Sequence, residues 1–167
     1  MFDRLQSEAE LDDVRVADVF AGTGTIGLEA LSRGAKSVVF YERDRRAHAL
    51  LEQNIQALGV EDCTLCWRVD VERTSFIPRG PAAELLPFDV VFFDPPFALT
   101  PRIRTGSPLY KSLERLARPE VTAPGALLLI RCTETAEFTC PELWHAQEPL
   151  TFSSCVIHLF RKAATPG

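Results

Sequence analysis

The stretch Asp18–Gly27, which reads DVFAGTGTIG, decides how the rest of the chain is interpreted. An apolar run over residues 14–20 leads into it, and the segment LEALSRG that follows has helical character. We therefore expect a strand that turns through glycines into a helix at 25–33, with Gly34 ending that helix. This arrangement is typical of the nucleotide-binding turns of α/β proteins.

Three glycines in this stretch follow the order G-x-G-x-x-G. Gly22 permits a turn with positive φ, Gly24 lets a ligand lie against the backbone, and Gly27 lets the helix pack close to the strand. Thr23 and Thr25 are expected to hydrogen-bond or to cap the new helix. For the glycines alone, a strand-to-helix turn that binds nothing is the alternative interpretation.

Asp18 narrows the choice of ligand. A dinucleotide site uses its backbone amides for a pyrophosphate, and a carboxylate at the end of the strand would repel that anion. S-adenosylmethionine carries a sulfonium and an ammonium group and no phosphate, so it suits this carboxylate better. The residues therefore favour a methyl donor as the ligand of the turn.

Two more carboxylates end the next two expected strands. Glu42 follows a buried strand at 37–41, roughly 20 residues past the glycines, where a carboxylate can bind ribose hydroxyl groups; a solvated acid is the alternative. Asp70 follows a strand at 63–69 and is placed to accept a hydrogen bond from an adenine amino group.

The other expected elements are a helix at 44–58, a loop with one helical turn at 73–86, a strand at 88–93, a polar, mobile loop at 98–108, a helix at 109–117, a strand at 125–131 and a closing β-hairpin at 144–152 and 153–161.

Length and composition predict one cytoplasmic domain over 1–167. The 167 residues are 46% hydrophobic, no apolar run reaches the length of a membrane span, and the first residues lack a signal-peptide pattern. Five scattered cysteines favour a reducing compartment.

Cys63 and Cys66 form C-x-x-C. Strand residues three apart point to opposite faces, and no nearby histidine completes a site. We therefore expect buried thiols and no metal. The net charge of −5 argues against a general polyanion-binding surface, although it is compatible with a local basic patch.

The segment Asp94–Phe97, DPPF, directly follows the apolar strand at 88–93. The exocyclic amine of a purine is a poor nucleophile, because its lone pair is delocalised into the ring. Methylation therefore needs acceptors that orient the N–H bonds: Asp94 can accept one, and the carbonyl of Pro95, fixed by the Pro95-Pro96 pair, can accept the other. Phe97 can stack on the base. A rigid turn is the alternative for DPPF alone, but together with the glycine turn the motif is far more specific.

Three segments, DVFAGTGTIGLEALSRGA, FYERD and VVFFDPPF, together resemble the RsmD family of 16S rRNA guanine-N2 methyltransferases. The resemblance covers most of the chain, about residues 2–162. It implies an α/β, Rossmann-like fold of the class I S-adenosylmethionine-dependent methyltransferases, with a seven-stranded mixed sheet whose last strand is antiparallel.

The resemblance also assigns roles to residues. The site that it implies consists of Asp18, Gly22 and Gly24 for the methionine part of the donor, Glu42 for the ribose, Asp70 and the Val71 amide for the adenine, and Asp94, Pro95, Pro96 and Phe97 for the target guanine. Ala21, Thr23, Arg43 and Asp94 complete the predicted cofactor-binding set.

Members of this family usually begin with a basic segment that forms a β-hairpin and a helix and is thought to help engage RNA. The chain starts at MFDRL, so we expect residues 1–13 to be the remnant of that helix and activity on ribosomal substrate to be weakened. The tail at 163–167 is expected to be frayed. The expected partners are 16S rRNA or 30S particles, with no membrane, and the expected state is a monomer.

Two other functions fit parts of the pattern. Methylation of adenine N6 or cytosine N4 in DNA uses the same D-P-P-aromatic chemistry, although no segment suits a DNA target-recognition domain. A non-catalytic donor-binding or assembly module fits the missing RNA-binding portion, although the intact DPPF segment argues against it. The leading prediction is transfer of a methyl group from S-adenosylmethionine to guanine N2 of small-subunit rRNA, with S-adenosylhomocysteine as the product.

Overall fold

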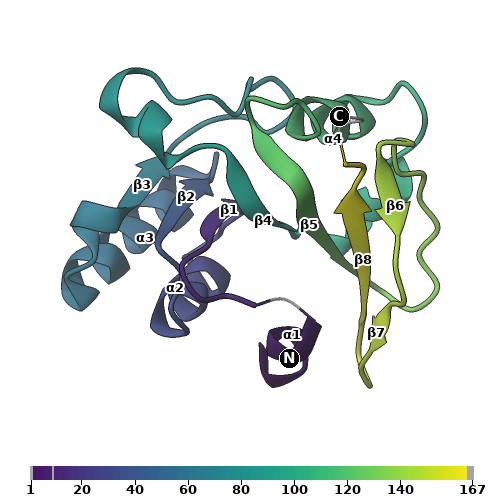
Figure 1. Ribbon diagram of the computed structural model, residues 1–167, viewed down its shortest axis with the longest axis horizontal. Helices are drawn as coiled ribbons and strands as arrows, with labels where there is room; N and C mark the ends of the chain where they lie inside the picture. The colour runs from purple at the N-terminus through teal and green to yellow at the C-terminus, as the bar shows by residue number, and fades with distance from the viewer. Residues whose placement is uncertain (1, 9, 165–167) are drawn as a thin grey trace.

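The computed structural model describes residues 2–8 and 10–164 and places one mixed sheet between helices on both of its faces (Figure 1). The strands are β1 (Arg15–Val19), β2 (Ser37–Tyr41), β3 (Thr64–Trp67), β4 (Phe88–Phe93), β5 (Thr122–Cys132), β6 (Trp144–Ala146), β7 (Leu150–Thr151) and β8 (Val156–Lys162). Within the described residues the order is β3-β2-β1-β4-β5-β8-β6, with β7 also paired to β8. The first five strands run parallel, whereas β8 is antiparallel to β5, β6 and β7.

This architecture confirms the expected fold class, including the antiparallel last strand. The sheet has eight strands in the described part of the chain, and not seven, because the first arm of the expected hairpin, 144–152, divides into β6 and β7. Pro149 lies between these two strands and has no N–H to donate, which interrupts the pairing with β8.

Two cores lie on the two faces of the sheet, because successive side chains of a strand point to opposite sides. The helices are α1 (Phe2–Glu8), α2 (Thr25–Ser32), α3 (Arg45–Leu58) and α4 (Pro108–Leu116), with short 3₁₀ helices η1 (Glu61–Cys63), η2 (Gly80–Leu85) and η3 (Phe97–Arg102). Phe2 and Leu5 of α1 share one core with Leu51 of α3. Leu113 and Leu116 of α4 belong to the other core. The helices α1, α2 and α3 therefore cover one face of the sheet, and α4 covers the opposite face.

Each of the three positions in the turn is occupied by glycine for a different structural reason. Gly22 has φ +59°, as predicted, and a Cβ added there would meet free space. A Cβ on Gly27 would collide with Cε1 of Phe40, which confirms that this glycine lets α2 pack closely on the sheet. With φ +87° at Gly24, an added Cβ would collide with Cδ1 of Leu51, so this glycine makes room for α3, and its expected contact with a ligand stays a prediction.

The first turn of α2 is capped by a residue of β1. Gly24 occupies the N-cap position and no side chain hydrogen-bonds there, so the expected capping by Thr23 or Thr25 is wrong. These threonines lie on either side of the N-cap position and not in it. Asp18 instead accepts the N–H of Gly27 with an O···N distance of 2.9 Å. The strand and the helix of the glycine turn are thus joined by a buried hydrogen bond.

Replacing Gly27 by alanine should lower the free energy of unfolding by about 1–3 kcal/mol. The new Cβ would lie 2.9 Å from Cζ of Phe40 and from Cγ1 of Val38, and both side chains are fully buried. This crowding outweighs the gain of at most about 1 kcal/mol that alanine has over glycine in a helix. Urea denaturation measures the difference. The loss should be smaller in a Phe40→Leu background, and equal stability of the wild type and the Gly27→Ala variant would contradict the close packing.

The segment 98–108, expected as a mobile loop, contains a short helix, two buried residues and local hydrogen bonds, and its mobility stays a prediction. It forms η3 and a turn, and the side chains of Thr100 and Ile103 are fully buried. The N–H of Ile103 bonds to the carbonyl of Thr100 at 3.0 Å. Thr100 and Ile103 are thus buried within a mostly polar segment, and they hold the chain after DPPF against the core.

Near the end of the chain, backbone hydrogen bonding continues as far as residue 163. Ala163 donates its N–H to the carbonyl of Leu143 at 2.9 Å, so the expected fraying does not begin there, and residues 165–167 lie outside the described residues. Over 2–8 and 10–164, no helix is both long and apolar enough to cross a membrane.

Candidate active site

Two hollows adjoin one another at the carboxyl ends of β1, β2 and β4. The first, of about 470 Å³, is called the Glu42 hollow, and its walls are Phe20, Gly22, Glu42, Asp44, Asp94, Pro95, Pro96, Phe97 and Arg131. The second, of about 560 Å³, is called the Glu29 hollow, and its walls are Phe2, Phe20, Ala21, Gly22, Thr23, Thr25, Ile26, Glu29, Asp94 and Arg131. Each has the size of a small-molecule site. Because they share Phe20, Gly22, Asp94 and Arg131, a long ligand can extend from one into the other.

Glu42 ties the end of β2 to the glycine turn. Its Oε1 accepts the N–H of Gly22 at 2.7 Å, and its Oε2 accepts the N–H of Asp44 at 2.8 Å. A carboxylate has about four lone-pair sites, so both oxygens keep capacity for hydroxyl donors in the Glu42 hollow. The carboxylate is thereby held in one orientation toward any ligand bound there.

Asp18 lies beneath the turn and lines neither hollow. It is 1% exposed, and its Oδ1 is buried without a hydrogen-bond partner among the described residues. Burial raises the pKa of this carboxyl to about 8, opposed by the N–H of Gly27 and reinforced by the charges of Asp94 and Glu42. Asp18 is therefore a buried and mostly neutral group at pH 7, with an oxygen left free beneath the site.

Arg43, Asp70 and Val71 form a separate group at the end of β3. Nη1 of Arg43 lies 3.6 Å from Oδ2 of Asp70, whose Oδ1 accepts the N–H of Glu72 at 3.0 Å. Val71 is buried, and its carbonyl accepts the hydroxyl of Ser112 at 2.9 Å. None of the three predicted residues borders either hollow. Their predicted contact with adenine stays a prediction.

The DPPF segment presents one free carbonyl and one exposed ring. The carbonyl of Pro96 accepts the N–H of Leu99 at 2.8 Å, whereas in the described part of the chain no hydrogen bond reaches the carbonyl of Pro95. Phe97 is 44% exposed and borders the Glu42 hollow, so its ring is available for stacking. The arrangement offers what the sequence predicts for an acceptor amine: an aspartate, a free proline carbonyl and an aromatic face.

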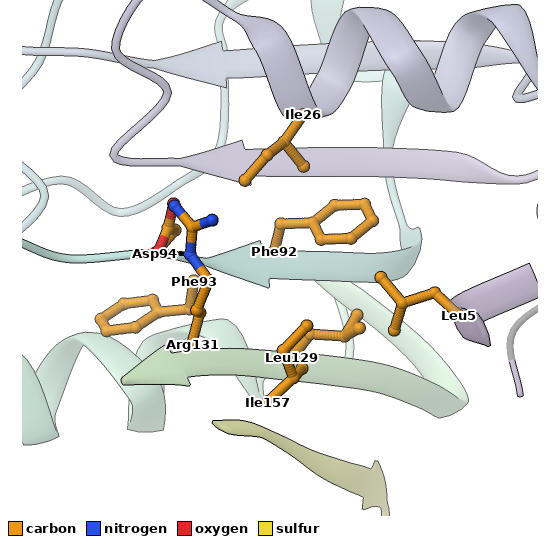
Figure 2. A pocket seen from close by; sticks show the side chains of 8 residues that line it. All are labelled: Leu5, Ile26, Phe92, Phe93, Asp94, Leu129, Arg131 and Ile157. Carbon is orange, nitrogen blue, oxygen red and sulfur yellow. Dashed lines mark hydrogen bonds and ion pairs between the residues drawn. The ribbon is translucent and has the colours of Figure 1, made fainter. Parts of the chain in front are cut away.

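Arg131 is a candidate functional side chain that sequence reasoning missed. Its Nε donates to Oδ1 of Asp94 at 3.0 Å and its Nη2 to Oδ2 at 2.7 Å, which makes a bidentate ion pair (Figure 2). Both residues line the two hollows. The register explains the meeting, because Phe93 of β4 pairs with Ile130 of β5, and the next residue of each strand therefore lies side by side. The signal was present in the sequence: Arg131 is a charged residue at a strand's carboxyl end, like Glu42.

The C-x-x-C pair is divided between two environments. Sγ of Cys63 donates to the carbonyl of Val60, whereas Cys66 lies beside His48 and Glu52, with the three potential ligand atoms within 4.8 Å of one another. The expectation that no histidine lies near these cysteines is therefore wrong in three dimensions, because α3 packs on β3. Burial, with the charges of Glu52 and Glu42, raises the pKa of the Cys66 thiol to about 12. This opposes the deprotonation that metal binding needs, and the expected absence of a metal stays a prediction. The expectation of buried thiols is wrong, because both Cys63 and Cys66 are only partly buried.

The order of the strands, together with the solved structures that the chain resembles, defines the fold. It is the Rossmann-like fold of the S-adenosylmethionine-dependent methyltransferases. A putative methylase, HI0767, from Haemophilus influenzae is 27% identical with a TM-score of 0.73, covering 97% of this chain and 93% of that one. An RNA methyltransferase from Salinibacter ruber, solved with S-adenosyl-L-homocysteine, has a TM-score of 0.70 at 16% identity, covering 99% and 92%.

The family model described as conserved hypothetical protein 95 matches residues 1–160, and the chain belongs to that family, the RsmD family. Ribosomal RNA small subunit methyltransferase D of Haemophilus influenzae is 31% identical over 76% of this chain and 61% of its own length. The protein of the same name from Escherichia coli strain K12 is 36% identical over 51% of this chain and 39% of its own length. The chain thus spans about 61% of the first of these relatives and less of the second.

Proposed function

We propose that this chain is an S-adenosylmethionine-dependent methyltransferase that methylates N2 of a guanine in 16S rRNA, free or within 30S particles. The observation that carries the proposal is that the glycine turn and Glu42 meet Asp94–Phe97 around one hollow. Family membership and the names of the relatives, which are rRNA methyltransferases, support it. We further propose that the protein acts as a monomer in the cytoplasm.

The donor end of the proposed site consists of the turn and the carboxylates around it. Glu42 would accept the ribose hydroxyls, while Ala21, Gly22 and Thr23 would form the wall along the methionine part. The unpartnered oxygen of Asp18 lies beneath that wall and adds a favourable polarity for a cationic ligand. Two adjoining hollows suit a ligand with a nucleoside at one end and an amino acid at the other. Arg43, Asp70 and Val71 would contact the adenine at the far edge.

The acceptor end would orient the amine for attack. When bound, the donor supplies an electrophilic methyl group on its sulfonium. Oδ2 of Asp94 would accept one N–H of guanine N2 and stabilise the positive charge that develops on the nitrogen, and the free carbonyl of Pro95 would accept the other N–H. Pro96 keeps the chain rigid, and Phe97 would stack on the base. These contacts hold the lone pair toward the methyl group.

Replacing Glu42 by alanine should weaken the binding of S-adenosylhomocysteine by about 10- to 100-fold, because a hydrogen bond to a charged group contributes roughly 1.5–3 kcal/mol. The variant also frees the N–H groups of Gly22 and Asp44, which loosens the turn. Titration calorimetry should show one site per wild-type chain and no effect of a metal chelator. Asp62→Ala, an exposed carboxylate on η1, is the matched control. Unchanged affinity of the Glu42 variant would contradict the ribose role.

Transfer of labelled methyl groups to 16S rRNA, to 30S particles and to duplex DNA tests the reaction, with mass spectrometry of the nucleosides. N2-methylguanosine in the rRNA is the expected product. N6-methyladenine or N4-methylcytosine in the DNA would replace the proposal by a DNA methyltransferase. Donor binding without transfer to any substrate would instead indicate a donor-binding module.

A further inference from the structure

We propose that Arg131 anchors the carboxylate of the donor's amino acid end, and that this contact prepares Asp94 for the acceptor base. The inference rests on the proposed function and adds to it a residue that neither the motifs nor the family resemblance assigns. It concerns the ion pair that joins β4 and β5 at the junction of the Glu42 and Glu29 hollows.

The first argument is charge. Among the side chains of the described residues that line the two hollows, Arg131 is the only cation, and Glu29, Glu42, Asp44 and Asp94 are the acids. A ligand with a sulfonium and an ammonium group suits such a surface, but its carboxylate does not. That carboxylate would be repelled by Asp94 unless a cation neutralised it. Arg131 is the cation in place, at the junction that the methionine part would cross.

The second argument is geometry. Figure 2 shows Arg131 extending from β5 with its guanidinium group against Asp94, while Leu129, Phe92 and Ile26 on the same face are apolar. The Arg131 side chain is 36% exposed and that of Asp94 is 15% exposed, so the arginine is the more accessible partner. Its Nε and Nη2 contact Asp94, and Nη1 has no hydrogen bond to the described residues. A guanidinium group has five donors in a planar fork, which leaves donors for a second carboxylate.

The third argument is what the ion pair does to Asp94. Each oxygen of Asp94 accepts one N–H of Arg131 and keeps a second lone-pair site, but the guanidinium group neutralises the negative charge that would stabilise the positive charge developing on the guanine amine. In our proposal Nη2 turns from Oδ2 of Asp94 to the donor carboxylate, while Nε keeps its bond to Oδ1. The freed Oδ2 faces the acceptor and the arginine still orients the aspartate. Donor binding thereby promotes acceptor binding.

The test compares two nucleosides by titration calorimetry: S-adenosylhomocysteine, which has the amino acid end, and 5′-methylthioadenosine, which lacks it. Arg131→Gln should weaken the binding of S-adenosylhomocysteine by about 10- to 100-fold, as for the loss of a charge-assisted hydrogen bond. The affinity for methylthioadenosine should change less than about twofold, because that ligand has no carboxylate. Arg131→Lys should recover part of the loss. Arg79→Gln, an exposed arginine outside both hollows, controls for the change in net charge.

The outcomes separate this inference from the proposed function. If the wild-type protein binds neither nucleoside, the donor site itself is wrong. If the wild type binds both and Arg131→Gln changes neither, Arg131 does not contact the carboxylate. If Arg131→Gln weakens both ligands equally, its role is to hold the structure of the site, and the proposal is overturned as well.

Discussion

Replacing Asp94 by alanine should lower the rate of methyl transfer by about 10²- to 10³-fold or more, the loss typical of removing a positioned electrostatic group from a transition state. The affinity for S-adenosylhomocysteine should stay within a few-fold of the wild type. The reason for the first effect is that Oδ2 of Asp94 would orient the amine and stabilise its developing charge. The reason for the second is that Arg131, released from its ion pair, stays available to the donor.

Asp94→Asn should retain part of the activity, because asparagine keeps an oxygen acceptor but loses the charge. Single-turnover transfer to 16S rRNA, together with calorimetry of donor binding, measures both effects. Asp89→Asn is the matched control: it lies on the same strand, and its Oδ2 accepts the N–H of Arg15 at the opposite end of β4. Loss of donor binding with normal turnover in Asp94→Ala would show that the proposed roles are wrong.

Replacing Asp18 by asparagine should remove a large pH dependence from the stability of the protein. Burial raises the pKa of Asp18 from 3.8 to about 8, so the folded state binds a proton that the unfolded state releases at lower pH. The contribution of Asp18 to stability is therefore complete below about pH 4 and is lost as the pH rises to about 8. In that window the wild type should lose up to about 1.4 kcal/mol for each pH unit relative to Asp18→Asn.

Urea denaturation of both proteins at several pH values from 5 to 8.5 measures this difference. Asparagine imitates the neutral carboxyl, because its oxygen can still accept the N–H of Gly27. Asp44→Asn is the matched control, since Asp44 is exposed and also accepts a backbone N–H, that of Ala47. Parallel stability curves for the wild type and Asp18→Asn would mean that Asp18 is ionised when folded.

Local patterns were enough to predict most of the fold. The parallel strands begin and end within a few residues of their expected bounds. The same holds for the helices expected at 25–33, 44–58 and 109–117. Their signals lie within short windows: the alternation or continuity of apolar residues, and glycines where φ must be positive. Some predictions failed because of a distant residue, as where α3 brings His48 beside Cys66, and others because of a local one, as where Pro149 divides the expected strand 144–152. Thr100 and Ile103 in the polar segment after DPPF are fully buried, and the composition of that segment does not reveal their burial.

The sequence by itself determined which residues were predicted for the candidate site, because Gly22, Glu42 and Asp94–Phe97 each lie in a local pattern that favours a role. Only the tertiary structure decided how these groups act together. Asp94 and Arg131 are 37 residues apart, and the parallel register of β4 and β5 makes them neighbours. The burial of Asp18 likewise depends on α2 covering β1. Register and burial are properties of segments packed against one another, and this is the physical reason that no single stretch of the chain contains them.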